Sequence, residues 1–256
     1  MQMTSTHQAK TPYRALLAGA TGLVGSELLT QLLADPACSS ITVLARRPLS
    51  KEASRSGYAA KLRVIVADFD RLEEALDGVE ADVVFCALGT TIKTAKTREA
   101  FRKVDYEYPA RLGNWASGHG DTRMIVISAV GASSGSKVFY SRVKGEIEDY
   151  LRSLGLAELH LLRPSLLLGK RAEFRLGERI AVLMSPLLRV LMVGPLRVYR
   201  PVWDAQVAAA MRAAASGRSG LPGGPIDGPQ VYLYENDQIA EAGNAMLRQE
   251  AGGTEA

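Results

Sequence analysis

Short apolar runs alternate with segments of helical periodicity from residue 14 to residue 165. The predicted strands are 14–19, 41–46, 62–69, 82–89, 123–131 and 158–165, and the predicted helices between them are 26–35, 71–78, 97–117 and 139–155. Strands that are apolar throughout, with helices between them, are typical of a parallel sheet covered on both faces. Because crossovers between parallel strands are right-handed, the alternation predicts a doubly wound α/β fold.

Three glycines lie between the first predicted strand and the first predicted helix, in the stretch LLAGATGLVGSELL. Glycine permits a tight turn and lets the backbone approach a pyrophosphate, while the following helix offers free N–H groups and a positive dipole to phosphates. In this context the spacing predicts a dinucleotide site rather than a turn without a ligand. The candidate residues are Gly19, Thr21, Gly22, Leu23, Val24 and Gly25.

The second predicted strand ends in Arg46 and Arg47. A carboxylate at this place would bind the ribose 2′-hydroxyl of NAD. Guanidinium groups instead suit a 2′-phosphate, through paired and charge-assisted hydrogen bonds. The two arginines therefore favour NADP(H), with a pair of ordinary surface arginines at a strand exit as the alternative.

The next two strands end in residues that we expect along the same crevice. Asp68 and Phe69 end the third strand near the expected adenine edge. Asp68 either accepts a hydrogen bond from the adenine amino group or caps the following helix. Gly89 would let the cofactor pass close to the backbone, and Thr90 could bond to ribose or phosphate. The candidate cofactor contacts at the end of the fourth strand are Ala87, Leu88, Gly89 and Thr90.

Tyr140 and Lys144 are four residues apart in the predicted helix 139–155, so their side chains share one face. The spacing alone is a weak signal. Ser128 adds weight to it, because this serine ends the fifth strand at the edge where the cofactor crevice is expected. A nearby ammonium favours phenolate, so Lys144 is expected to lower the pKa of Tyr140. We interpret the three residues as a catalytic group with Tyr140 as the acid/base.

Several longer stretches resemble a known family. GATGLVG, YSRVK and LLRPS are similar to motifs of the short-chain dehydrogenase/reductase superfamily. CALGTTIKTAKTREAFRKVDYEYPARL, ISAVGA, FYSRVKGEIE and RPSLLLGKR resemble its atypical branch, which contains the Tat-interactive oxidoreductase and bacterial relatives. The resemblance covers most of residues 14–250. It implies a Rossmann fold, NADPH, a Tyr-x-x-x-Lys active site, a small carboxy-terminal substrate region and a place for Pro164 near the nicotinamide.

Two positions depart from the pattern of that superfamily. Its reductases often end the fifth strand with two serines, of which the second is catalytic, but here Ala129 follows Ser128. Asp105 stands where many members carry an asparagine that organises a water of the proton relay. These departures concern the rate and the type of reaction, not cofactor binding. The serine role falls to Ser128 or to a serine of the following loop, Ser133, Ser134 or Ser136.

The alternation breaks down beyond residue 170. Residues 179–194 are apolar but contain Pro186 and Arg189, which favours a lid or a homodimer contact over a membrane anchor. A helix is expected at 204–216, a short strand at 231–236 and a closing helix at 237–249. The expected organisation is a disordered leader (1–12), an NADP-binding core (13–169), a small substrate region that completes the domain (170–250) and a flexible tail (251–256).

The formal net charge is +4, and residues 161–220 carry a local balance of +7. This positive region could attract an anionic ligand, with a solvated arginine-rich surface as the alternative. A basic run interleaved with aromatics does not occur, which argues against nucleic acid. The arginines that could hold an anionic substrate tail are Arg171, Arg175, Arg179, Arg197 and Arg200.

The two cysteines, Cys38 and Cys86, lie far apart, and neither a CxxC motif nor a Cys/His cluster suggests a metal site. Two buried, reduced thiols are therefore expected. The amino-terminal residues contain no apolar run suited to a signal peptide, and the sequence has no stretch of about 18 apolar residues. These features predict a soluble, cytoplasmic protein without a membrane span.

Taken with the motifs, these features favour an NADPH-dependent oxidoreductase that transfers hydride to a small carbonyl substrate. One alternative is an NADPH-binding regulatory protein without significant turnover, whose carboxy-terminal surface binds a partner. Another is an enzyme resembling sugar-nucleotide epimerases and dehydratases. The sequence does not name the substrate, because specificity is expected to reside in the irregular segment 170–203.

Overall fold

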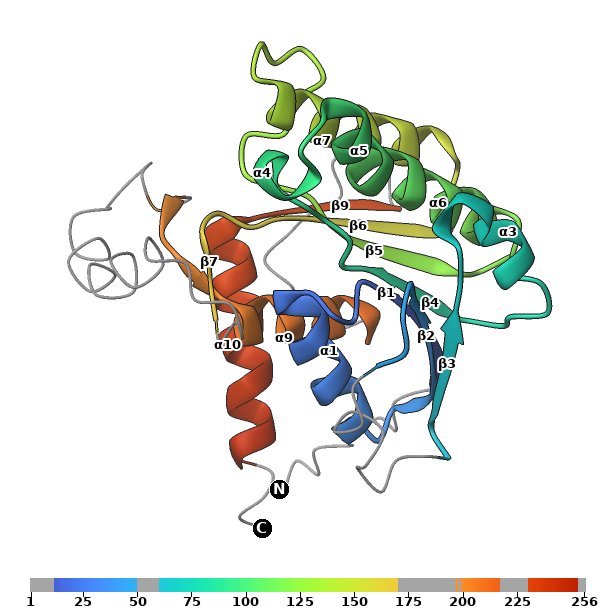
Figure 1. Ribbon diagram of the computed structural model, residues 1–256. Coiled ribbons are helices and arrows are strands. Elements are labelled where there is room, and N and C mark those ends of the chain that lie inside the picture. Colours follow the sequence, from blue (N-terminus) through green and yellow to red (C-terminus); the bar gives the residue numbers. More distant parts are fainter. Residues whose placement is uncertain (1–11, 50–59, 170–196, 198, 217–229, 253–256) are drawn as a thin grey trace.

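Seven parallel strands form the central sheet of the computed structural model, which describes residues 12–49, 60–169, 197, 199–216 and 230–252. The strand order across the sheet is β3-β2-β1-β4-β5-β6-β9 (Figure 1). The order changes direction between β1 and β4, where ligand crevices form in sheets of this kind. The strands are β1 (Tyr13–Ala18), β2 (Cys38–Ala45), β3 (Leu62–Val66), β4 (Val83–Cys86), β5 (Arg123–Ile127), β6 (Glu158–Arg163) and β9 (Val231–Glu235).

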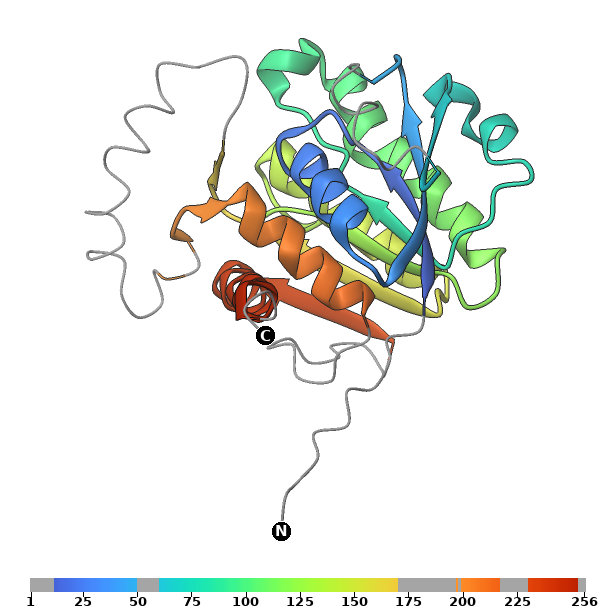
Figure 2. The ribbon, with the colours of Figure 1, turned by 90° about the horizontal axis from the view of Figure 1, so that it is seen from below.

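Helices cover both faces of the sheet, which confirms the predicted doubly wound α/β fold. One face carries α1 (Leu23–Ala34), α9 (Asp204–Ala215) and α10 (Asn236–Gly252), with α9 packed between the other two (Figures 1 and 2). The opposite face carries the shorter helices and α7. They are α3 (Leu72–Ala75), which follows a 3-10 turn at Phe69–Arg71, α4 (Ile92–Ala95), α5 (Arg98–Arg102), α6 (Tyr108–Ser117) and α7 (Phe139–Ser153).

Adjacent residues of the central strands point to opposite sides of the sheet. In β1, Leu17 belongs to the apolar core under α1 and α9, and Leu16 belongs to the core under α6 and α7. Phe85 and Val84 of β4 divide in the same way, and none of these four side chains is exposed. A sheet buried on both faces needs strands that are apolar at every position, which is the pattern found in the sequence.

Pro109 explains an interruption in the predicted helix 97–117. The chain is helical from Arg98 to Ser117, but residues Lys103–Glu107 form a π-helical turn between α5 and α6. Proline has no N–H for the carbonyl of the residue four places earlier, here Asp105, and its ring crowds that carbonyl. A π-turn shifts the hydrogen bonds by one residue and so relieves the conflict. Single π-turns inside helices are frequent at functional sites.

The structure adds a small parallel sheet that the sequence pattern did not predict, formed by β7 (Leu167–Leu168) and β8 (Val202–Trp203). Two residues are too few for periodicity to reveal a strand. The closing helix also reaches Gly252, two residues into the predicted tail. The predicted lid or homodimer contact at 179–194 lies outside the described residues, as do leader residues 1–11.

Cys38 and Cys86 are both buried and free, as predicted. Within the described ranges, no helix is long and apolar enough to cross a membrane. The same ranges hold no group of three or more side chains placed to bind a metal ion.

Candidate active site

The turn between β1 and α1 is a cradle made of backbone. Gly19 has a φ of +95°, and a Cβ atom there would lie 2.5 Å from the carbonyl oxygen of Ala87. A Cβ atom on Gly25, in the first turns of α1, would lie 2.0 Å from the carbonyl oxygen of Gly19. No side chain fits at either position, so the glycines are what allow β1, α1 and the end of β4 to approach one another.

The first turn of α1 faces this cradle. Gly22 is the N-cap residue, and no side chain caps the helix. The first N–H groups of a twelve-residue helix are therefore left for a ligand, and the helix dipole favours a negative one. The cradle fits the pyrophosphate of a dinucleotide.

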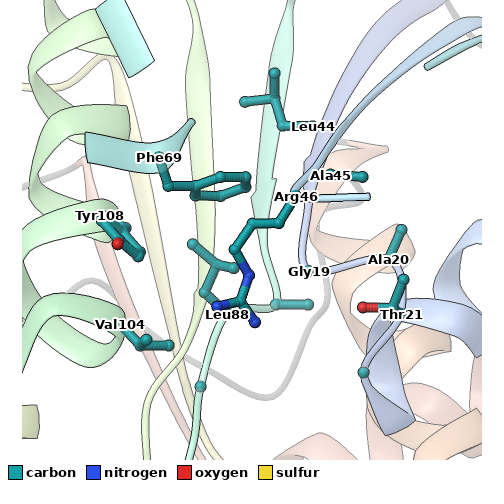
Figure 3. Close-up of a pocket in the computed structure, with 13 residues that line it drawn as sticks. Gly19, Ala20, Thr21, Leu44, Ala45, Arg46, Phe69, Leu88, Val104 and Tyr108 are labelled. Carbon is teal, nitrogen blue, oxygen red and sulfur yellow. The ribbon is translucent and has the colours of Figure 1, made fainter. Parts of the chain in front are cut away.

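A first cavity extends from the cradle toward β2 and the π-turn (Figure 3). The side chain of Arg46 extends into it toward Leu88, and the ring of Phe69 also lines it. Both arginines are exposed, but Arg47 is not part of the described lining, so only Arg46 of the predicted pair faces the cavity. The first cavity is also lined by residues that were not predicted from the sequence, namely Leu44, Ala45, Val104 and Tyr108. They were missed because they precede a strand end or come from a helix, whereas the sequence-based prediction considered only residues at strand ends.

Asp68 is placed differently from its neighbour Phe69. Its carboxylate accepts a hydrogen bond from the backbone N–H of Asp70, at 3.0 Å, and caps the 3-10 turn Phe69–Arg71. It is also absent from the described lining of the first cavity. Of the two interpretations of Asp68, the structure shows the cap, and the adenine contact stays a prediction.

A second cavity, of about 770 Å³, continues from the same cradle toward β5 and α7. Its volume is in the range of small-molecule sites. The three predicted catalytic residues, Ser128, Tyr140 and Lys144, all line it. Gly25 supports the cradle without lining either cavity. The other predicted residues on the wall of the second cavity are Thr21, Gly22, Leu23, Val24, Ala87, Leu88, Gly89, Thr90 and Pro164.

Ser128 is the one predicted serine on the described wall of this cavity. Its side chain is buried, and its Oγ atom has no hydrogen-bond partner among the described residues. In the following loop, Ser136 is engaged elsewhere, because its hydroxyl accepts from the N–H of Val138 at 3.1 Å. An unpartnered hydroxyl buried at a cavity wall is costly unless a ligand completes it.

Lys144 forms a buried ion pair with Asp105, the residue that stands in place of the asparagine. Lys144 Nζ lies 2.8 Å from Asp105 Oδ1, and the two side chains are 5% and 0% exposed. The other carboxylate oxygen of Asp105 accepts from the backbone N–H of Thr90, at 2.9 Å. Lys144 also donates to the carbonyl oxygen of Ile127, at 3.4 Å. The lysine is therefore held directly by the end of β5 and by the π-turn, and the loop after β4 acts on it through Asp105.

The electrostatic state of Tyr140 differs from the prediction. Burial raises the pKa of Tyr140 above its ordinary value; Lys144 lowers it, and Asp105 raises it further. Lys144 therefore acts in the predicted direction, but the predicted net lowering is wrong, because burial outweighs the one favourable charge. Burial would lower the pKa of Lys144, yet Asp105 and Tyr140 together raise it above its ordinary value. The pair is a phenol beside an ammonium.

The predicted anion-binding arginines are not brought to this wall by the described part of the chain. Arg197 and Arg200 are absent from the described lining of the second cavity. Arg171, Arg175 and Arg179 lie outside the described residues. Beyond Pro164, the carboxy-terminal half contributes Ser165 and Leu167 to the wall.

Comparison with known proteins identifies the family. The model of a family described as NAD(P)H-binding matches residues 19–167, which is more than half of the chain. Among curated proteins, the chain is 35% identical over 168 residues to "Protein fmp52, mitochondrial" of Emericella nidulans, covering 64% of this chain and 71% of that one. It is 34% identical over 166 residues to "Protein HTATIP2" of Rattus norvegicus, covering 64% and 67%.

Solved structures share the fold at low sequence identity. The PhqB reductase domain from Penicillium fellutanum has a TM-score of 0.62 at 15% identity, covering 90% of this chain and 70% of that one. The enzyme WbmG of Bordetella bronchiseptica, in complex with NAD, has a TM-score of 0.60 at 17% identity, covering 96% and 80%. The family match and the two curated relatives confirm the resemblance seen in the motifs. This chain belongs to the NAD(P)H-binding family, within the atypical short-chain dehydrogenases/reductases.

Proposed function

We propose that the protein is an NADPH-dependent reductase of a carbonyl compound, with Tyr140 as the acid. The observation that carries the proposal is the meeting of Ser128, Tyr140 and Lys144 in one cavity that continues from the glycine cradle. A nucleotide-binding protein without chemistry needs the cradle but has no use for a buried, unpartnered hydroxyl beside a phenol and an ammonium.

Each of the three side chains has a distinct part in this reduction. Bound NADPH supplies the hydride, which adds to the carbonyl carbon. Ser128 Oγ, which lacks a partner in the described residues, donates to the carbonyl oxygen and polarises it. The Tyr140 hydroxyl gives its proton to that oxygen as the C=O double bond becomes a single bond, and the resulting phenolate regains a proton from solvent. Lys144 would bind the ribose next to the nicotinamide.

The preference for NADPH over NADH rests on Arg46. Its guanidinium group lies in the first cavity, at the end of β2, where the adenine ribose of a dinucleotide is expected. A 2′-phosphate would gain charge-assisted hydrogen bonds there. In the part of the chain that the structure describes, no acidic side chain lines this cavity to favour a free 2′-hydroxyl.

A panel of aldehydes and ketones, with NADPH consumption as the readout, tests the proposal. The wild-type protein should reduce at least one compound, and Tyr140→Phe should lower that rate by about 10²- to 10⁴-fold, the usual contribution of a general acid. The affinity of Tyr140→Phe for NADPH should remain close to that of the wild type. Tyr150→Phe is the matched control, because Tyr150 lies in the same helix but bonds to Asn114.

Two outcomes would count against this function. Tyr140→Phe with the wild-type rate would show that the tyrosine is not the acid. Tight NADPH binding with no compound reduced would favour the regulatory alternative.

A further inference from the structure

The buried ion pair between Asp105 and Lys144 is the feature of the site that proton donation by Tyr140 does not itself require. Removing two charges from water is costly, and such a pair often adds little to stability compared with neutral side chains of the same size. Here both side chains are almost completely buried, and Lys144 lies on the wall of the reaction cavity. Its position points to a role in chemistry rather than in folding.

Asp105 connects two parts of the site. One carboxylate oxygen pairs with Lys144, and the other accepts from the N–H of Thr90 in the loop after β4. Gly89 of this loop lies over the pair: a Cβ atom on it would be 3.6 Å from Asp105 Oδ1 and 3.9 Å from Lys144 Nζ. The π-turn that precedes Pro109 is the segment that carries Asp105.

The charged and titratable groups that act on this cluster come from three elements. Tyr140 and Lys144 belong to α7, Asp105 to the π-turn and Cys86 to β4. From β5 the lysine receives an uncharged partner, the carbonyl oxygen of Ile127. Lys144 is thus the one cation and Asp105 the one carboxylate that act on Tyr140 among the described residues.

We propose, resting on the proposed function, that Asp105 is a positioning residue that acts on Tyr140 through Lys144. It holds the ammonium beneath Gly89 and offsets its charge, so that Tyr140 stays protonated and the site is suited to carbonyl reduction rather than to alcohol oxidation. Reduction needs a phenol that donates, whereas oxidation needs a phenolate that accepts a proton. The raised pKa of Tyr140 agrees with this assignment.

An asparagine in place of Asp105 would favour the deprotonated form of Tyr140, whereas the aspartate is proposed to keep it protonated. Its side chain is nearly the same size as that of the aspartate but carries no charge, so the ammonium of Lys144 would no longer be offset. An uncompensated positive charge close to a phenol favours phenolate. Asp105→Asn should therefore raise the acid dissociation constant of Tyr140, and it should raise the rate of alcohol oxidation relative to that of carbonyl reduction.

The direct test is the titration of Tyr140 by NMR in protein labelled with ¹³C at the tyrosine ring, which requires no substrate. Tyr140→Phe identifies the resonance. Asp105→Asn is expected to increase the acid dissociation constant of Tyr140 about tenfold or more, the usual effect of one nearby charge. An unchanged or decreased constant would overturn the proposal.

Asp70→Asn is the matched control. Asp70 also bonds to a lysine and a tyrosine, Lys103 and Tyr108, but it lies outside the second cavity. Its replacement should leave the titration of Tyr140 unchanged. A shift as large as that of Asp105→Asn would show that the effect is not specific to the pair, and would also overturn the proposal.

A double variant keeps the test decisive if Asp105→Asn does not fold. Asp105→Asn with Lys144→Met removes both charges and leaves no unpaired ion. Since the two charges offset each other in the proposal, the dissociation constant of Tyr140 should stay within about tenfold of the wild-type value. A larger increase would contradict the proposal.

The outcome is separable from that of the proposed function. If no carbonyl compound is reduced but the titration of Tyr140 shifts as expected, the proposed reductase function is wrong and the proposed effect of Asp105 on Tyr140 is supported. If Tyr140→Phe abolishes reduction but Asp105→Asn does not shift the titration of Tyr140, the proposed reductase function is supported and the proposed role of Asp105 is wrong.

Discussion

At the scale of single residues, Ser128 is a candidate for function because its hydroxyl lacks a hydrogen-bond partner among the described residues. Its Oγ atom is buried at the cavity wall without a partner among the described residues, while its backbone N–H donates to the carbonyl oxygen of Leu162 at 2.7 Å. A hydroxyl that served packing alone would bond to a neighbour. The unmet hydrogen bond supports the proposed role of Ser128 as a donor to the substrate oxygen.

Ser128→Ala should separate stability from activity. The change removes a buried hydroxyl that has no described partner, so the melting temperature should stay the same or rise slightly. Turnover should fall about 10²-fold, the usual loss for one donor to a developing oxyanion, with NADPH affinity unchanged. Thermal unfolding measures the melting temperature, and steady-state kinetics measure the turnover. Ser133→Ala, in the adjacent loop, is the control; equal losses in the two variants would exclude the assigned role of Ser128.

At the scale of elements, the close approach of α1 to β1 shapes the proposed cofactor site. A Cβ atom on Gly25 would lie 2.0 Å from the carbonyl oxygen of Gly19, a distance that forces the helix and the turn apart. Gly25→Ala should therefore destabilise the fold by about 2 kcal/mol or more and should abolish NADPH binding.

Thermal unfolding and a cofactor titration check this prediction. Gly252→Ala is the matched control, because Gly252 is also helical but has open space around its Cβ position. The control should melt at the wild-type temperature and bind NADPH normally. Wild-type affinity in Gly25→Ala would show that the cradle is not the pyrophosphate site.

The end of β2 makes a second prediction at this scale. Arg46 lines the first cavity and Arg47 does not, so the two arginines should differ in effect. The wild-type protein should bind NADPH at least about tenfold more tightly than NADH, which corresponds to 1.4 kcal/mol. Arg46→Ala should remove this preference, and Arg47→Ala should preserve it. Binding titrations with both cofactors decide; an unchanged preference in Arg46→Ala would refute its contact with the 2′-phosphate.

At the scale of the whole molecule, the sequence predicts the sheet better than it predicts the site. Strands such as β1 and β4 are recognisable because burial on both faces demands apolar residues throughout. The two-residue strands β7 and β8 leave no such pattern. Their partners are distant in sequence, and only the folded chain brings them together.

The position of the candidate site could be predicted from the sequence, but its electrostatics could not. Parallel strands end on one edge, so Ser128, Tyr140 and the glycine turn were expected to meet. The ion pair of Lys144 with Asp105 depends on a π-turn, which no periodicity predicts. The sign of the pKa shift of Tyr140 depends on how deeply its ring is buried, and Phe101 contributes to that burial, with ring centroids 5.7 Å apart.

The most direct measurement of the central claim follows deuterium from NADPH labelled at the nicotinamide C4 position into the alcohol product. Mass spectrometry of the products from a panel of carbonyl compounds should show one deuterium at the former carbonyl carbon with the wild-type protein. Tyr140→Phe should bind the labelled cofactor and transfer almost none. Transfer at the wild-type level by Tyr140→Phe would contradict the account.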